Sequence, residues 1–221
     1  MTLSTTLVNT QLDQHKKGRS WKLIAVAGGT LLVIKAVVLP FLTPALRKIC
    51  IPYLPATQGQ IKNFAHLLKH CKGPLVDLGS GDGRLVLHAA KMGLVAHGIE
   101  LNPWLILYST IVKVYLKTFI RLTSQKSGNV FTDIRFYRKN LWNMPLSQYR
   151  TVVVFGVKEM MPRLKDKIIK ELDQGSKVIT CRFPLITRET DAKILPYKID
   201  DLKLIFKIED GIDSMWLYQK S

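Results

Sequence analysis

The stretch that most constrains the fold of this chain is VDLGSGDGR, residues 76–84, which follows an apolar run and leads into a helix-forming sequence. Gly79, Gly81 and Gly83 alternate with polar residues there. Glycine allows tight backbone angles and leaves room for a ligand to lie on the main chain. A strand, such a loop and a helix are typical of doubly wound sheets, whose ligands bind at the carboxyl ends of the strands. We therefore expect a ligand-binding site at this loop.

The spacing and charge of the loop distinguish between possible ligands. A dinucleotide fingerprint reads GxGxxG, whereas the glycines here read GxGxG and Arg84 stands where the third fingerprint glycine would be. No GKS or GKT follows, as a P-loop would require. Asp77 and Asp82 would repel a pyrophosphate but suit a ligand with ammonium and sulfonium charges. These features predict S-adenosylmethionine as the cofactor.

Polar residues after the next two expected strands extend this site. Glu100 ends the second strand in GIELNPW, where an acid can accept hydrogen bonds from both ribose hydroxyls of an adenosine. Asn140 follows the third strand and could meet the adenine amino group, with Leu141 beside the ring, although Asn after a strand is also a common turn former. The predicted cofactor-binding residues are Asp77, Gly79, Ser80, Gly81, Asp82, Gly83, Arg84, Glu100, Asn102, Asn140 and Leu141.

Beyond residue 52 the apolar pattern alternates between short strands and helices. Expected strands are residues 75–78, 95–99, 134–137, 152–155 and 177–181, and expected helices are residues 83–92, 103–122 and 159–173. An earlier helical face runs from Ile61 to Leu68, with Thr57 as its N-cap. The alternation predicts an α/β fold with a mostly parallel sheet covered on both faces. Two extended runs, residues 202–208 and 214–218, predict a closing antiparallel hairpin.

The N-terminal part has a different composition. Residues 1–20 are rich in Ser and Thr and end in basic residues, which is typical of a targeting leader. Residues 21–45 are hydrophobic and long enough to reach across a bilayer, but Lys35 lies inside this segment and Pro40 interrupts it. A membrane-inserted anchor, an uncleaved targeting segment and a cleaved signal therefore stay open as alternatives. Residues 46–221 are expected to form the catalytic domain.

The net charge and the candidate metal-binding residues limit which ligands and partners the chain is expected to bind. The formal net charge of +17 attracts polyanions such as nucleic acid or an acidic lipid surface. Cys50, Cys71 and Cys181 form no CxxC pair, so we expect neither a zinc ribbon nor a disulfide framework. His66 and His70 stand four residues apart, but no third ligand follows at a suitable spacing. We therefore expect no metal.

The segments that carry a family resemblance are TPALRKICIPYLPAT, VDLGSGDGRLVLHAAKMG, GIELNPWLILYS, the NLW of RKNLW, VVVFGV, CRFP and GIDSMWLY. Together they resemble the class I, seven-strand, S-adenosylmethionine-dependent methyltransferases. They resemble more closely a small family of mitochondrial protein-lysine methyltransferases, which acts on the c-subunit of ATP synthase and on the adenine nucleotide translocase. TPALRK and FGVKEMM resemble the c-subunit branch more than the translocase branch.

The resemblance implies a Rossmann-like seven-stranded sheet preceded by an N-terminal hydrophobic helix. It also implies S-adenosylmethionine as cofactor, a protein-lysine substrate, and a location at the mitochondrial inner membrane. The c-subunit is the expected substrate, with the translocase or a mitochondrial RNA as alternatives. A nucleic-acid partner is not expected, despite the basic charge, because no RNA-binding module is recognisable. A non-enzymatic assembly factor that retains a cofactor fold is a further alternative.

The sequence identifies no general base. Glu159, after the fourth expected strand, is a candidate for contacting the target ammonium, although a charge on a helix surface is the favoured interpretation. No Asn/Asp-Pro-Pro-aromatic motif follows that strand, which disfavours a planar nitrogen of an amide or of adenine as the methyl acceptor.

Overall fold

The computed structural model describes residues 21, 24–35, 54–123, 133–185 and 197–221. The chain divides into two units, Met1–Cys50 and Ile51–Ser221. In the first unit residues 24–35 are helical and exposed, while the leader predicted at residues 1–20 lies outside the described residues. Among the residues that the structure describes, no helix has the length and apolar character that a membrane crossing needs. Insertion of residues 21–45 into a membrane stays a prediction.

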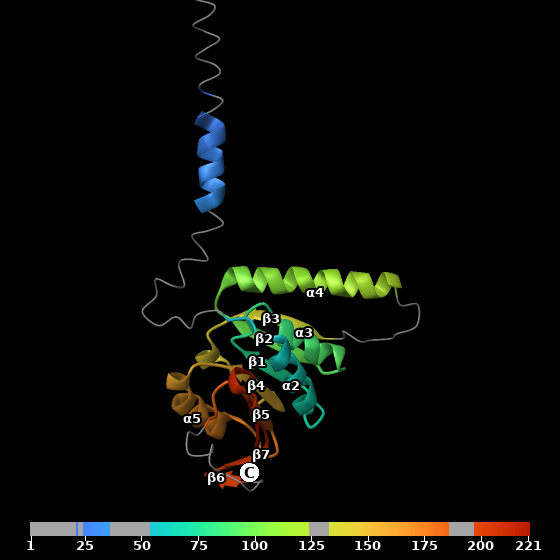
Figure 1. Cartoon of the computed structure of the whole chain (residues 1–221), viewed down its shortest axis with the longest axis vertical. Helices are drawn as coiled ribbons and strands as arrows, with labels where there is room; N and C mark the ends of the chain where they lie inside the picture. The colour runs from blue at the N-terminus through green and yellow to red at the C-terminus, as the bar shows by residue number, and fades with distance from the viewer. Residues whose placement is uncertain (1–20, 22–23, 36–53, 124–132, 186–196) are drawn as a thin grey trace, which may run out of the picture. The chain divides into compact units, whose positions relative to one another are not determined.

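The second unit is built on one eight-stranded mixed sheet, ordered β3-β2-β1-β4-β5-β8-β7-β6 (Figure 1). Its strands are β1 (Leu75–Leu78), β2 (Ala96–Glu100), β3 (Ile134–Arg138), β4 (Thr151–Phe155), β5 (Lys177–Cys181), β6 (Tyr197–Ile199), β7 (Leu202–Ile208) and β8 (Met215–Lys220). Strands β1 to β5 pair in parallel, and β8, β7 and β6 continue the sheet antiparallel. The predicted parallel sheet and closing hairpin are thereby confirmed.

The predicted number of seven strands is wrong by one. The eighth strand is β6, which pairs with the outer edge of β7 over three residues. So short an edge strand carries no readable alternation of apolar and polar residues, and for that reason the sequence did not reveal it. The other predicted strands agree with the observed ones within two residues at each end.

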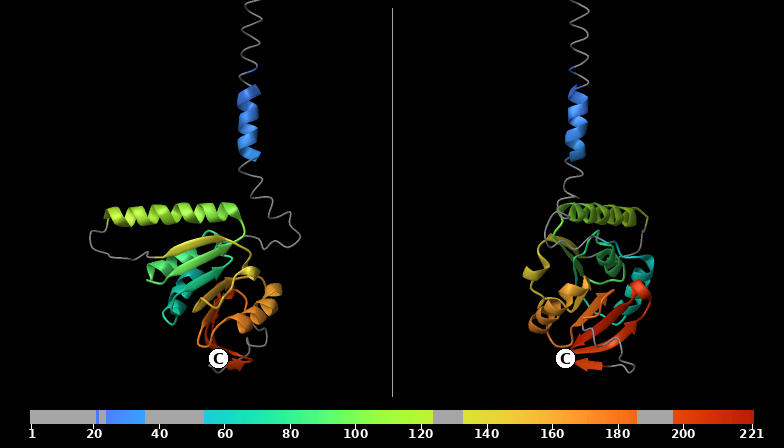
Figure 2. Two further views of the ribbon diagram at one scale, coloured as in Figure 1. Left: turned by 180° about the vertical axis from the view of Figure 1, so that it is seen from behind. Right: turned by 60° about the vertical axis from the view of Figure 1, so that its left-hand side comes forward.

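Four helices pack on the sheet: α2 (Gln58–Leu68), α3 (Arg84–Lys91), α4 (Pro103–Thr123) and α5 (Met161–Glu171). Figure 2 shows α2 and α3 on one side of the sheet and α5 on the other. The predicted cap of α2 is confirmed, because Thr57 Oγ1 accepts a hydrogen bond from the Gln60 amide and the Gln60 side chain accepts one from the Thr57 amide.

Both faces of the sheet are buried, which explains the apolar runs of its central strands. On one face Val76, Val152 and Val178 pack with residues of α5, and on the other Leu75 and Val153 pack with residues of α2 and α3. Because the chain passes from β1 to β2 and β3 and then returns to β4, the strand order reverses between β1 and β4. Ligands of open α/β sheets bind at such a switch point, at the carboxyl ends of the strands.

Candidate cofactor site

The glycine-rich loop lies at this switch point, between the end of β1 and the start of α3. Gly79, Gly81 and Gly83 have φ angles of 90°, 53° and 79°, in the left-handed region that favours glycine. A Cβ atom on Gly83 would lie 2.6 Å from Cζ of Phe136 and 2.9 Å from Cβ of Ser109, whereas one on Gly79 would meet no atom within 4 Å. Gly83 is therefore needed for packing, and Gly79 leaves an open face from which a ligand can approach the main chain.

Glu100 joins this loop to the end of the neighbouring strand. Its Oε2 accepts a hydrogen bond from the Gly81 amide at 3.1 Å, and its Oε1 accepts bonds from the Leu101 and Asn102 amides at 2.8 Å each. The structure thus brings Glu100 against the loop, while its predicted hydrogen bonds to the ribose hydroxyls stay a prediction. A carboxylate offers about four lone-pair sites, so the amides occupy most of its capacity before any ligand binds.

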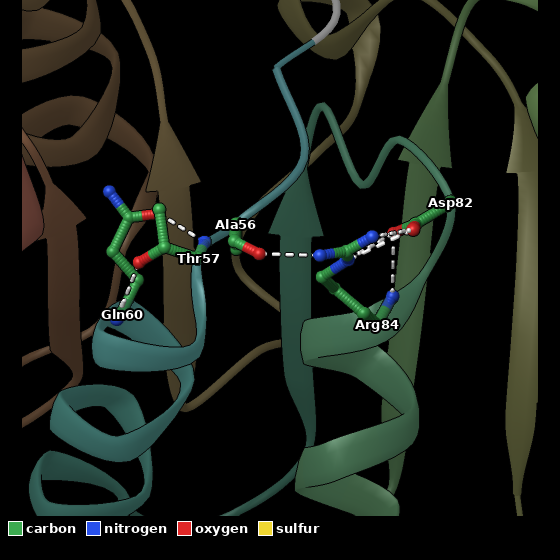
Figure 3. A network of polar contacts seen from close by, with 5 residues as sticks. All are labelled: Ala56, Thr57, Gln60, Asp82 and Arg84. Carbon is green, nitrogen blue, oxygen red and sulfur yellow. Dashed lines mark hydrogen bonds and ion pairs between the residues drawn. The ribbon is translucent and has the colours of Figure 1, made fainter.

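Asp82 is paired within the loop rather than left as a free charge. Arg84 Nε lies 3.0 Å from Asp82 Oδ1, and Arg84 Nη2 lies 2.6 Å from Asp82 Oδ2 (Figure 3). Arg84 Nη1 also donates to the carbonyl of Ala56, next to the capping residue of α2. This network is not predicted from the sequence alone, although the arginine in place of the third fingerprint glycine was a visible signal. A direct role of Asp82 at the cofactor stays a prediction.

Asp77 is the most perturbed acid of the site. It is 2% exposed on β1, between Gly98 of β2 and Val153 of β4. Burial raises the pKa of Asp77 to about 8, and the charges of Glu100 and Asp82 act in the same direction. Oδ1 of Asp77 and Oγ of Ser80 are buried and make no hydrogen bond within the described part of the chain. Since buried polar atoms are normally paired, both fit a site that takes a hydrogen-bonding, cationic ligand.

The two predicted asparagines both cap the segments that follow them. Asn102 Oδ1 accepts a hydrogen bond from the Trp104 amide at 3.0 Å, at the start of α4. Asn140 Oδ1 accepts one from the Trp142 amide at 3.1 Å, at the start of the short 3-10 helix Leu141–Asn143. The turn-forming interpretation of Asn140 is therefore observed, and its contact with adenine stays a prediction. Leu141 is partly buried against the core beside it.

The other residues that the sequence singled out do not take part in the hydrogen bonds around the glycine loop. Glu159 is exposed in the 3-10 helix Lys158–Met160, after the carboxyl end of β4. The rings of His66 and His70 pack against Phe206, with centroids 5.9 and 4.9 Å from it. Over the described ranges, no group of three His, Cys, Asp or Glu residues is arranged to hold a metal ion. Trp142 packs under the guanidinium of Arg163, 4.1 Å from its ring centroid.

Two family models match this chain. The model described as ANTKMT methyltransferase domain matches residues 77–192, and the model of the N-terminal domain of ATP synthase c-subunit lysine N-methyltransferases matches residues 18–47. The first of these ranges contains the glycine loop, Glu100, Asn140 and Glu159.

Relatives with known names align over most of the chain. The ATP synthase c-subunit lysine N-methyltransferase of Mus musculus is 42% identical and covers 95% of this chain and 75% of its own length. The protein of the same name from Xenopus laevis is 44% identical, with coverages of 91% and 79%. The adenine nucleotide translocase lysine N-methyltransferase of Mus musculus is 32% identical, with coverages of 95% and 82%.

Solved structures share the fold at low sequence identity. An RNA methyltransferase from Salinibacter ruber, in complex with S-adenosyl-L-homocysteine, superposes with a TM-score of 0.57 at 19% identity, covering 76% of this chain and 94% of its own. The glycopeptide N-methyltransferase MtfA superposes with a TM-score of 0.51 at 12% identity, with coverages of 75% and 96%. The predicted Rossmann-like methyltransferase fold is thereby confirmed.

Proposed function

The chain belongs to the family of ATP synthase c-subunit lysine N-methyltransferases, and from this premise we propose that it methylates a lysine side chain of the c-subunit of ATP synthase. The observation that carries the proposal is the agreement among relatives. Those from Mus musculus, Rattus norvegicus, Xenopus laevis, Homo sapiens and Caenorhabditis elegans carry that one name at 38 to 44% identity, over 89 to 95% of this chain.

The chain is a methyltransferase that uses S-adenosylmethionine. The local structure fits this cofactor in three respects. The open face at Gly79 allows close approach to the main chain, the buried oxygens of Asp77 and Ser80 have no hydrogen-bond partner among the described residues, and Glu100 reaches the loop from the next strand. When bound, the cofactor supplies a methyl group on a positively charged sulfonium.

Each residue of the site has a proposed binding role. Glu100 accepts hydrogen bonds from the ribose hydroxyls, which requires at least one of its amide partners to yield or to share. Asn140 and Leu141 flank the adenine at the end of β3. Asp77, with the main chain of the glycine loop, holds the cationic amino acid part. Arg84 keeps Asp82 and the loop in position for these contacts.

The acceptor lysine must be neutral and aligned before it can react. A free lysine has a pKa of about 10.4, and desolvation beside a positive charge lowers that value. Holding the nitrogen about 3 Å from the methyl group, opposite the sulfur, is the main requirement of such an in-line displacement. Glu159 follows β4 at the same edge of the sheet and is exposed, so it is available to attract the incoming ammonium before its proton leaves to water.

The proposed location is the mitochondrial inner membrane. The Ser- and Thr-rich basic leader at residues 1–20 and the hydrophobic segment at residues 21–45 support this location, as does the family match over residues 18–47. The translocase is the second candidate substrate, because the relative that bears its name is 32% identical. An RNA substrate is supported only by the charge of +17.

The experiment combines purified protein, tritiated S-adenosylmethionine and mitochondrial membranes from cells that lack the enzyme. The products are divided between protease and RNase and separated on a gel, and the Glu100→Ala variant serves as the binding-deficient control. A protease-sensitive band at the size of a very small proteolipid supports the c-subunit. A carrier-sized band would move the assignment to the translocase, and label removed by RNase would overturn a protein substrate.

A further inference from the structure

α4 has an outward face made of large apolar side chains. The six residues of this outer face are each between 49 and 66% exposed: Leu107, Tyr108, Ile111, Val114, Tyr115 and Phe119. The opposite side of the helix already packs on the domain, since Leu105 and Ser109 are buried and Val112 and Leu116 contact the core. α4 is therefore apolar on both sides, unlike the half-polar helix expected at the surface of a soluble domain.

Apart from Phe119, which makes a further contact, no described helix or strand of residues 51–221 is seen to lie against the outer face. Figures 1 and 2 show α4 running along the β3 end of the sheet, with its far side away from the other elements of this unit. The rings of Tyr115 and Phe119 stack on one another at 6.3 Å, and both are more than half exposed. A contiguous exposed apolar surface of this kind marks a site of interaction.

The charges around the outer face indicate its partner. The sequence of α4, PWLILYSTIVKVYLKTFIRLT, contains no acidic residue. Lys113 and Lys117 are partly exposed and lie one turn apart, in the sector between the outer face and the buried side of the helix. Apolar and aromatic side chains edged by lysines are the pattern of a helix that lies in a membrane interface. A second copy of this chain fits less well, because two molecules of charge +17 repel one another.

We propose that the outer face of α4 lies in the surface of a membrane that contains anionic lipids, with Lys113 and Lys117 at the level of the lipid phosphates. α4 begins at Pro103, close after Glu100 at the end of β2, so this orientation brings the carboxyl edge of the sheet, with its glycine loop, to the bilayer. Leu101, which lies between Glu100 and the start of α4, is also apolar and 48% exposed. The inference goes beyond the proposed function and does not require it.

The test uses the full chain with Tyr115 replaced by the photo-crosslinking amino acid p-benzoylphenylalanine. The matched control carries the same group in place of Ile212, which is 63% exposed in the 3-10 helix Gly211–Asp213. Each protein is irradiated with vesicles of tritiated phosphatidylcholine, with and without phosphatidylserine, and lipid label on the protein is measured. No cofactor or methyl acceptor is present, so the result is independent of the substrate assay.

We expect several-fold more lipid label at position 115 than at position 212, and less label on vesicles that lack phosphatidylserine. Ile111→Glu in the position-115 protein should reduce the label several-fold without changing its melting temperature, because Ile111 is exposed. Equal label at both positions would overturn the proposal, since membrane attachment elsewhere in the chain would account for it. Crosslinks from position 115 to a second copy or to residues 1–53 instead of lipid would also overturn it.

Discussion

The amide nitrogen of Gly81 lies 3.1 Å from Oε2 of Glu100, so the end of β2 holds the tip of the loop that follows β1. This bond links the two elements whose sequences predict a cofactor site, and it gives Glu100 a structural role in addition to its proposed role in cofactor binding. A substitution there should therefore affect the loop and the ligand together.

Glu100→Ala should weaken S-adenosylmethionine binding by about 3 kcal/mol, or roughly 100-fold, because two hydrogen bonds to a charged acceptor are lost. The cofactor affinity of Glu100→Gln should lie between that of Glu100→Ala and that of the wild type. Calorimetric titration gives both dissociation constants. The exposed Glu159 provides the control, since Glu159→Ala should leave cofactor affinity unchanged. An unaltered affinity in Glu100→Ala would place the ribose elsewhere.

Gly83 and Gly79 should respond differently to the same change. Gly83→Ala introduces an atom 2.6 Å from the Phe136 ring at a φ of 79°, so it should lower the free energy of unfolding by about 3 kcal/mol. Gly79→Ala carries only the backbone cost of about 1–2 kcal/mol, because its Cβ meets no atom within 4 Å.

Comparing Gly83→Ala with Gly79→Ala distinguishes a loss of packing from a loss of cofactor binding. Urea denaturation should rank Gly83→Ala as the less stable variant. Relative to the stability that each variant loses, the folded Gly79→Ala protein should lose more cofactor affinity than Gly83→Ala. The reverse ranking in urea would mean that Phe136 moves aside and that Gly83 is not needed for packing.

The fold and the position of the loop could be predicted because they depend on local patterns: apolar runs, glycine spacing, and an acid at a strand end. The contact of Gly83 with Phe136 and the bond from Arg84 to Ala56 depend on residues distant in sequence that meet only after folding. Asn140 shows the opposite case, in which one local pattern fits a cap and a ligand contact equally well. The sequence alone therefore does not decide between these two roles of Asn140.

Arg84→Lys should reveal the positioning role of the guanidinium. Lysine keeps the charge but cannot bridge both oxygens of Asp82 and the Ala56 carbonyl at once. Because the Arg84 side chain is 35% exposed, the free energy of unfolding should fall by only about 1 kcal/mol or less, while the KM for S-adenosylmethionine rises. Arg163→Lys, beside Trp142, is the control, and an equal rise in its KM would contradict a specific role for Arg84.

Removal of residues 1–45 should abolish mitochondrial import while leaving the cofactor affinity of the remaining chain intact, because the glycine loop and Glu100 lie in the other unit. Fluorescence microscopy of tagged full-length and truncated chains measures the first effect, and calorimetry the second. Import of the truncated chain at the wild-type level would refute the targeting role assigned to this segment.

Asp77 should make stability and cofactor affinity change in opposite directions with pH. Its folded pKa of about 8 lies above the ordinary value of 3.8 because of burial, so the neutral form is favoured in the fold. The stability it contributes is complete below pH 3.8 and is lost as pH rises through about 8, at about 1.4 kcal/mol per pH unit. Asp77→Asn removes the titrating proton, so its stability should decline less over this range.

The affinity for S-adenosylmethionine should change with pH in the opposite direction to the stability. A cationic ligand favours the ionised carboxylate, so the affinity of the wild type for S-adenosylmethionine should increase between about pH 6 and the folded pKa of about 8, with up to roughly a tenfold gain per unit. Binding should also release a proton, which calorimetry in buffers of different ionisation enthalpy detects. Asp77→Asn should bind more weakly and with little dependence on pH. If the variant and the wild type instead show parallel pH profiles for both unfolding and binding, another group titrates, and the buried carboxylate of β1 does not hold the cationic part of the cofactor.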